Sequence, residues 1–271
     1  MNLLSGTVLV TGATGGIGQA IARALRPRGA EMILTGRRSD VLQTLAGELG
    51  ARGIVCDLSR RDELDRLVSE VGPVDVLIAN AGTPAGGLLT ELSQPEIDHA
   101  LETNLRAPIA LARALAPAMV ARGRGHLVFV SSLQGKAAVP NTSVYSATKF
   151  GLRGFALALR QDLRPSGVGV SVVLPGFISH AGMFAVAQTR LPPGIGTRRP
   201  EDVAAAVMAA IERNRAEIEV APIPLRLGSA IASVAPGLSA AVSRRLGSER
   251  IAARIVAGQR NAAATTPNDN E

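Results

Sequence analysis

The chain has 271 residues, of which 46% are apolar and 19% charged, so general disorder is excluded. Its 29 basic and 22 acidic residues give a net charge of +7, but the two signs are interleaved, and only 2% of the residues are aromatic. Nucleic-acid binding through a basic run or through base stacking is therefore not expected. A single cysteine, Cys56, excludes an internal disulfide and a zinc site built on several cysteines.

Short apolar runs alternate with amphipathic stretches along the first 220 residues. The runs rich in β-branched residues predict strands over residues 7–11, 31–35, 53–56, 74–79, 126–131, 168–174 and 217–220. Helical periodicity predicts helices over residues 16–28, 39–49 (capped by Ser39), 61–71, 94–121, 144–163 and 201–213. Pro108 and Pro117 should bend or divide the long helical stretch. This order predicts a single doubly wound parallel α/β sheet of about seven strands, with helices on both faces.

The alternation ends near residue 221. We expect one Rossmann-type domain over residues 1–221 that includes a substrate loop at 177–200, a helical C-terminal extension over 222–261, and a disordered tail over 262–271. In the extension, Leu238, Val242 and Leu246 recur every four residues beside several arginines. We favour packing of this extension against protein over contact with an anionic membrane surface. No run approaches the roughly 20 apolar residues of a membrane span, and no secretory leader is recognised, so a cytoplasmic protein is expected.

A glycine-rich turn joins the first strand to the first helix. Its sequence is Thr11-Gly12-Ala13-Thr14-Gly15-Gly16-Ile17-Gly18. Glycines between a strand and a helix are the context that a dinucleotide-binding turn requires, because they let a pyrophosphate approach the backbone and the free N–H groups of the helix. Glycine spacing alone is a weak signal, so this turn needs support from other residues.

The end of the second strand distinguishes between two nicotinamide cofactors. An NAD enzyme places an acid there to bind the ribose 2′-hydroxyl, whereas here Arg37 and Arg38 follow the strand. Two guanidinium groups suit a 2′-phosphate, because arginine matches phosphate geometry with paired hydrogen bonds. NADP(H) is therefore favoured, and NAD(H) stays possible.

One tyrosine and one lysine are spaced for joint chemistry. Tyr145 is the only tyrosine of the chain, and Lys149, one of only two lysines, follows four residues later on the same face of a predicted helix. A free phenol has a pKa near 10 and is a poor base at neutral pH, and a neighbouring ammonium would lower that pKa. The pair predicts a phenol that exchanges a proton with a substrate.

With these residues, the chain resembles the short-chain dehydrogenase/reductase family over about residues 7–220. The matching motifs are, in chain order, the glycine-rich turn with Thr11, Gly12, Gly16 and Gly18, the acid Asp57 followed by Leu58, Asn80-Ala81-Gly82, Asn104, Ser132 (thirteen positions before the tyrosine), Tyr145 with Lys149, and Pro175-Gly176. Each motif is weak alone, but all of them in order make a strong match. The resemblance also implies a homodimer or homotetramer.

The resemblance implies a role for each catalytic residue. Tyr145 would act as general acid and base, Ser132 would hydrogen-bond the substrate oxygen, Lys149 would bind ribose hydroxyls and depress the pKa of Tyr145, and Asn104 would hold a water that links Lys149 to solvent. No metal site is expected. The cofactor-binding residues would be Gly12, Thr14, Gly15, Gly16, Ile17, Gly18, Arg37, Arg38, Asp57, Leu58, Asn80, Ala81, Gly82, Tyr145, Lys149, Pro175, Gly176 and Ile178.

The substrate loop departs from the family pattern. His180, preceded by Ser179, stands where the family commonly has a threonine that touches the nicotinamide amide, and which of the two replaces it is open. The loop is otherwise apolar, with Phe177, Ile178, Met183, Phe184, Val186 and Leu191, and Arg190 is its main charge. An apolar lid suits a small apolar ketone or secondary alcohol. We therefore expect an NADP(H)-dependent carbonyl reductase or alcohol dehydrogenase; the alternatives are an NAD-dependent alcohol dehydrogenase and a non-catalytic dinucleotide-binding scaffold or regulatory module.

Overall fold

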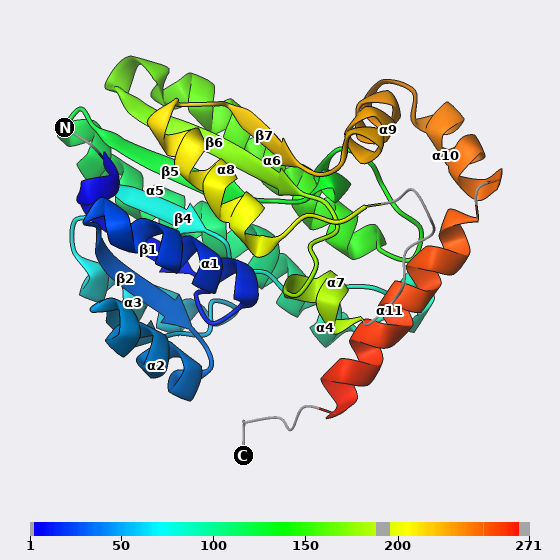
Figure 1. Ribbon diagram of the computed structural model, residues 1–271, viewed down its shortest axis with the longest axis horizontal. Coiled ribbons are helices and arrows are strands. Elements are labelled where there is room, and N and C mark those ends of the chain that lie inside the picture. The colour runs from blue at the N-terminus through cyan, green and yellow to red at the C-terminus, as the bar shows by residue number, and fades with distance from the viewer. Residues whose placement is uncertain (1–2, 188–195, 246, 266–271) are drawn as a thin grey trace.

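Figure 1 shows the computed structural model, which describes residues 3–187, 196–245 and 247–265. Within these residues, the core is a seven-stranded parallel sheet in the order β3-β2-β1-β4-β5-β6-β7. The strands are β1 (Thr7–Thr11), β2 (Glu31–Gly36), β3 (Arg52–Val55), β4 (Val76–Ala79), β5 (Gly125–Val130), β6 (Val168–Pro175) and β7 (Glu217–Val220). The predicted doubly wound α/β fold is confirmed.

The strand order reverses between β1 and β4. The chain builds the sheet outward from β1 to β3, then returns to place β4 on the other side of β1, where Val10 pairs with Ile78. In open α/β sheets, ligands bind in the crevice outside the carboxyl ends of the strands at such a reversal. The residues that follow β1, β2, β3 and β4 therefore meet at one edge of the sheet.

Helices cover both faces of the sheet (Figure 1). One apolar cluster joins the sheet to α1 (Gly16–Leu25), α2 (Ser39–Leu49) and α8 (Pro200–Glu212). A second cluster joins the other face to α3 (Arg61–Val71), α5 (Ala107–Ala121) and α6 (Ser143–Leu163). The central strands are continuous apolar runs because both of their faces are buried, as in β4, whereas the edge strand β7 alternates glutamate with apolar residues.

The stretch over residues 94–121 forms three consecutive helical segments: α4 (Gln94–Leu101), the π-helical segment Glu102–Arg106, and α5, which has Pro108 in its first turn and continues through Pro117. One local expectation is wrong: Ser39 does not cap α2. It is the first residue of that helix, and the cap position belongs to Arg38, whose side chain makes no capping hydrogen bond.

Three further helices follow the sheet: α9 (Ile223–Val234), α10 (Pro236–Arg245) and α11 (Ser248–Thr265). Of these, α11 packs against α7 (Gly182–Val186), and Gln259 Nε2 donates to the Met183 carbonyl at 3.1 Å. The expected packing of the extension against protein thus holds for α11, whereas Leu238 and Val242 of α10 are exposed.

Because α11 continues to Thr265, the disorder expected from residue 262 is wrong for residues 262–265; residues 266–271 and Leu246 lie outside the described residues. Among the described residues, none of the helices combines the length and the apolarity that a membrane span requires.

Candidate active site

The glycine-rich turn owes its shape to glycines at three places. Gly12 has a φ of 65°, and a Cβ there would lie 2.7 Å from Ala81 Cα. A Cβ on Gly18 would lie 2.2 Å from the Gly12 carbonyl oxygen, so the close approach of α1 to β1 needs a glycine, as expected. At Gly16 a Cβ would lie 2.4 Å from Ala181 Cβ, so this glycine admits the loop after β6, a contact the sequence did not indicate.

The N-terminus of α1 is open to a ligand. Its cap residue is Gly15, and no side chain of the described residues satisfies the first N–H groups of the helix. Ile17 lies in the first turn and packs beside the lid, with its Cδ1 3.5 Å from where a Cβ on Gly182 would stand. Uncapped N–H groups at the positive end of a helix bind phosphate.

Asn80 joins the ends of β1 and β4. Its Nδ2 donates to the Thr11 carbonyl at 3.0 Å, and the Thr11 hydroxyl accepts from the N–H groups of Asn80 and Ala81, each at 3.1 Å. The side chain of Asn80 therefore holds the ends of β1 and β4 together, whereas Ala81 and Gly82 line the crevice.

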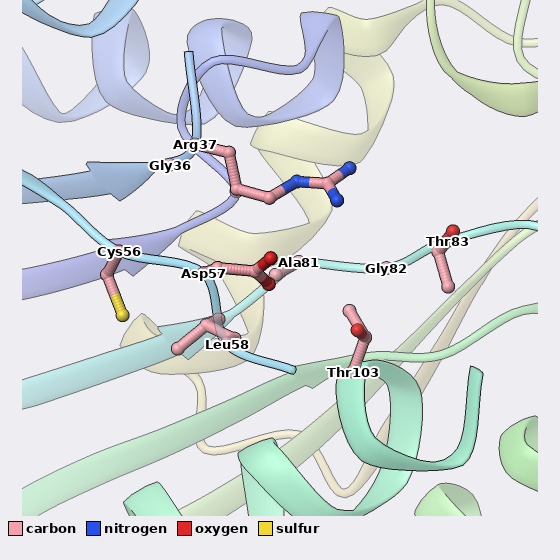
Figure 2. A pocket seen from close by; sticks show the side chains of 10 residues that line it. Gly36, Arg37, Cys56, Asp57, Leu58, Ala81, Gly82, Thr83 and Thr103 are labelled. Carbon is pink, nitrogen blue, oxygen red and sulfur yellow. The ribbon is translucent and has the colours of Figure 1, made fainter. Parts of the chain in front are cut away.

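A pocket opens at the reversal of the sheet (Figure 2). Arg37 extends over it from the end of β2, with Asp57 and Thr103 around it. Six expected cofactor residues line the pocket, and four lining residues were missed. The expected ones are Gly12, Arg37, Asp57, Leu58, Ala81 and Gly82, and the missed ones are Gly36, Cys56, Thr83 and Thr103. Each missed residue directly adjoins a motif residue in the sequence, which is the only signal that could have found it.

The charges around the pocket suit an anionic group. Neither Arg37 nor Arg38 forms an ion pair among the described residues, and Arg38 Nη2 donates to the carbonyl of Thr14. Asp57 is held by Ser59, whose N–H and hydroxyl donate to its Oδ1 at 3.0 and 2.8 Å. Burial and the nearby Arg37 charge lower the pKa of His99 on α4, in keeping with a positive field at this end of the pocket.

Two adjacent serines at the end of β5 have different partners. The Ser131 hydroxyl is buried and donates to the Lys149 carbonyl at 2.9 Å, which ties β5 to α6. The Ser132 hydroxyl accepts from the Gln134 N–H at 3.1 Å and lies 3.4 Å from the Pro175 carbonyl oxygen. Ser132 is also the hydrogen-bond partner of the Tyr145 phenol. The structure thus brings Ser132, and not Ser131, to the tyrosine.

Tyr145 and Lys149 lie together on α6, as their spacing predicts. Lys149 Nζ stands 5.6 Å from the centre of the Tyr145 ring and donates to the Val130 carbonyl at 3.3 Å. Burial raises the pKa of Tyr145 to about 12, and the Ser132 hydrogen bond lowers it only in part. The expected depression of this pKa by Lys149 is therefore not the dominant effect. Burial also lowers the pKa of Lys149 to about 8.

Asn104 belongs to the π-helical segment and is fully buried. Its amide is bonded to both backbone groups of Thr83, and a Cβ on Gly82 would stand 3.2 Å from Asn104 Oδ1 and 3.6 Å from Lys149 Nζ. The side chain therefore fixes the loop after β4 beside Lys149. Short π-helical segments inside α-helices often occur at functional sites.

The loop after β6 closes the other side of the crevice. Pro175 ends β6, the Gly176 N–H donates to Val220, and the rings of Phe177 and Phe184 pack at 5.0 Å. Ile178 has a side chain that is 3% exposed and belongs to the apolar cluster that contains α8. The Ser179 hydroxyl bonds to the Arg198 carbonyl at 3.2 Å.

His180 is exposed with a φ of 62°, so of the two candidates for the family threonine only His180 keeps an unengaged side chain among the described residues. Arg190 and Leu191 of the expected lid lie outside those residues. In the part of the chain that the structure describes, no group of three or more His, Cys, Asp or Glu side chains could hold a metal ion.

Comparison with known proteins identifies the family. A family model described as short chain dehydrogenase matches residues 6–191. The chain belongs to the short-chain dehydrogenase/reductase family. It is 40% identical over 235 residues to "Ketoacyl reductase HetN" of Nostoc sp., a match that covers 83% of this chain and 82% of the relative.

Two solved structures of family members hold a nicotinamide cofactor. A metagenomic short-chain oxidoreductase in complex with NADP is 35% identical, with a TM-score of 0.68, covering 82% of this chain and 97% of that one. A variant of actinorhodin polyketide ketoreductase with NADPH is 32% identical, with a TM-score of 0.73, covering 81% of this chain and 97% of that one. The resemblance read from the motifs is confirmed.

Proposed function

We propose that this protein is an NADP(H)-dependent reductase of apolar ketones, which also runs in reverse on secondary alcohols, with Tyr145 as general acid and base. The observation that carries the proposal is that Ser132, Tyr145 and Lys149 lie together at the carboxyl edge of the sheet. They lie beside a pocket that Arg37 lines. A scaffold that only bound a dinucleotide would need the pocket but not the phenol.

The residues present fit NADP(H). The hydroxyl of Thr103 lines the pocket and is buried without a hydrogen-bond partner among the described residues, so it can bond to a ligand there. Arg37 and Arg38 would hold the 2′-phosphate, the open N-terminus of α1 the pyrophosphate, Asp57 the adenine side, and Lys149 the ribose hydroxyls. The structures with NADP and NADPH support this choice over NAD(H). When bound, the nicotinamide supplies the hydride.

The protein residues handle the substrate oxygen and its proton. With a pKa of about 12, Tyr145 is protonated at neutral pH and is ready to donate its proton to a carbonyl oxygen that gains negative charge. The Ser132 hydroxyl holds that oxygen beside the phenol, and the Lys149 ammonium favours the phenolate that the transfer leaves behind. The phenol therefore carries the proton that the reduction of a carbonyl consumes, so this protonation state suits reduction.

The lid favours an apolar substrate. The rings of Phe177 and Phe184 pack together at 5.0 Å, and Met183 Cε lies 3.6 Å from where a Cβ on the pocket residue Gly82 would stand. The lid helix α7 packs against α11. Burying a charged substrate there without a partner would be costly. Because two of the relatives are a ketoacyl reductase and a polyketide ketoreductase, a ketone on an acyl chain is the first class to test.

The test is a rate measurement with purified protein and NADPH on matched ketones. We expect NADPH oxidation with a 3-ketoacyl thioester or an aryl alkyl ketone, and at least about tenfold lower kcat/KM with pyruvate, a charged ketone of similar reactivity. Ser132→Ala should lower the rate without weakening NADPH binding. No oxidation with any apolar ketone, or a preference for pyruvate, would overturn the proposal.

A further inference from the structure

The other lysine of the chain, Lys136, lies at the end of the segment that carries Ser132. Lys136 follows the short turn Leu133–Gly135, and its N–H donates to the Leu133 carbonyl. This turn is tightly seated, because a Cβ on Gly135 would lie 2.8 Å from the Lys149 carbonyl oxygen. A shift of Lys136 therefore moves the backbone that presents Ser132.

The ammonium of Lys136 bridges two carboxylates of the edge strand β7. Its Nζ lies 3.2 Å from Glu217 Oε1 and also pairs with Glu219 Oε1. The two glutamates are two residues apart on the strand, so they share one face of the sheet. The three side chains are between 12% and 20% exposed, so solvent screens this group less than a surface pair.

Each glutamate is shared with an arginine from another element. Glu217 pairs with Arg153 of α6 at 2.6 Å, and Glu219 pairs with Arg226 of α9 at 3.3 Å. The Lys136 carbonyl accepts from Ser233, also on α9, at 3.2 Å. The group thus joins the Ser132 segment to β7, to the helix that carries Tyr145, and to the C-terminal extension.

The same strand also supports Ser132 from the other side. Val220 of β7 pairs with Pro175, whose carbonyl oxygen lies 3.4 Å from the Ser132 hydroxyl. In a chain with 29 basic residues of which only two are lysines, one lysine stands in the reaction centre and the other here. A compact ammonium can bridge two carboxylates in a space that a planar guanidinium fills differently.

We infer that Lys136, held by Glu217 and Glu219, is a positioning residue of the reaction: it fixes the Ser132 hydroxyl against the Tyr145 phenol. The expected effect of Lys136 on the rate rests on the proposed function. Its expected effect on the contact between Ser132 and Tyr145 does not depend on that function. Lys136 does not line the cofactor pocket, so we expect its substitution to leave NADPH affinity unchanged.

The kinetic test compares Lys136→Met in two backgrounds. In the wild-type background, we expect kcat to fall about tenfold or more, because misplacing a reacting group by about 1 Å costs up to about 100-fold, while the Kd for NADPH stays within about twofold. In the Ser132→Ala background, the same substitution should change kcat less than about twofold, because its target is gone. Equal losses in both backgrounds, or an unchanged kcat, would overturn the inference.

A spectroscopic test needs no turnover. Tyr145 is the only tyrosine, so protein labelled with ¹³C at the tyrosine ring gives one signal that reports its hydroxyl contacts. Lys136→Met should move this signal in the same direction as Ser132→Ala, and an unmoved signal would overturn the inference even if no ketone were reduced. Should Lys136→Met fail to fold, Glu219→Gln, which leaves Glu217 in place, should give a smaller shift in the same direction. Arg23→Met, which removes an exposed pair with Glu48 at 3.0 Å, is the control and should leave the signal unchanged.

Discussion

Asn104 and Thr83 bind each other through two hydrogen bonds. The Thr83 N–H donates to Asn104 Oδ1 at 2.8 Å, and Asn104 Nδ2 donates to the Thr83 carbonyl at 2.9 Å. The amide side chain of Asn104 thus pairs with both the N–H and the carbonyl of Thr83, as a neighbouring strand would. Thr83 is a loop residue that lines the pocket. The loop after β4 and the π-helical segment are thereby fixed to each other beside Lys149.

Asn104→Ala should destabilise the protein, because it leaves two backbone groups of Thr83 without partners. Each unsatisfied buried group costs about 1–3 kcal/mol, so we expect a loss of about 2–4 kcal/mol in the free energy of unfolding, measured by urea denaturation. Gln94→Ala, which removes an exposed amide bonded to Asp98 at 2.9 Å, is the control and should cost less than about 0.5 kcal/mol. Equal costs for the two variants would contradict the bracing role of Asn104.

Lys149→Met should stabilise the free protein while it abolishes turnover. Burial lowers the pKa of Lys149 to about 8 from an ordinary 10.5, so the folded state binds fewer protons than the unfolded state between these values. Below pH 8 the wild type bears the full cost of the buried charge, about 3 kcal/mol, and this cost disappears as the pH rises to 10.5. Unfolding free energies of both proteins from pH 7 to 10.5 should therefore converge. A difference between the two unfolding free energies that does not change with pH would refute the cost assigned to the buried Lys149 charge.

His126 should make the fold acid-sensitive. Its ring is buried, lies 2.8 Å from the Ser171 hydroxyl, and has a pKa lowered by burial from 6.5 to about 4. The unfolded state binds the proton first, so stability present above pH 6.5 is lost as the pH falls to 4, by about 3 kcal/mol. Compared with His126→Asn, the wild type should lose that much more stability over this range, whereas His180→Asn, at an exposed site, should behave as wild type. Parallel curves for wild type and His126→Asn would rule this out.

Arg37→Ala should weaken NADPH binding and leave NADH binding nearly unchanged. A charged hydrogen bond to phosphate is worth about 1.5–3 kcal/mol, so the Kd for NADPH should rise about 10–100-fold, as followed by nicotinamide fluorescence at fixed, low salt. Arg38→Ala should act in the same direction, and Arg23→Ala should change neither cofactor. A parallel loss of affinity for both cofactors would show that Arg37 supports the pocket and does not recognise the phosphate.

The sequence predicts best what depends on local patterns. The central strands emerge because they are apolar runs buried on both faces, such as β6, and the family motifs lie at strand ends, where the parallel order brings them to one edge. Tyr145 and Lys149 meet because helical spacing alone brings them together.

What the sequence misses depends on contacts between distant residues. The π-helical segment at Glu102–Arg106 is bonded to Thr83, which lies some twenty residues away in the sequence. Ile178 is turned into the core by its bridge to Arg198, which no local pattern reveals. The burial that raises the pKa of Tyr145 likewise depends on distant residues, whereas Lys149 is visible in the sequence.

The role of Tyr145 is tested most directly by the turnover of Tyr145→Phe with NADPH and the best ketone substrate, with NADPH affinity measured on the same samples. The substitution removes one oxygen atom and keeps the ring. We expect kcat to fall by about 10²–10⁴-fold while the Kd for NADPH stays within about twofold, because the phenol acts on the substrate oxygen and not on the cofactor's phosphates. A variant that turns over within about threefold of the wild type would contradict the central role of Tyr145.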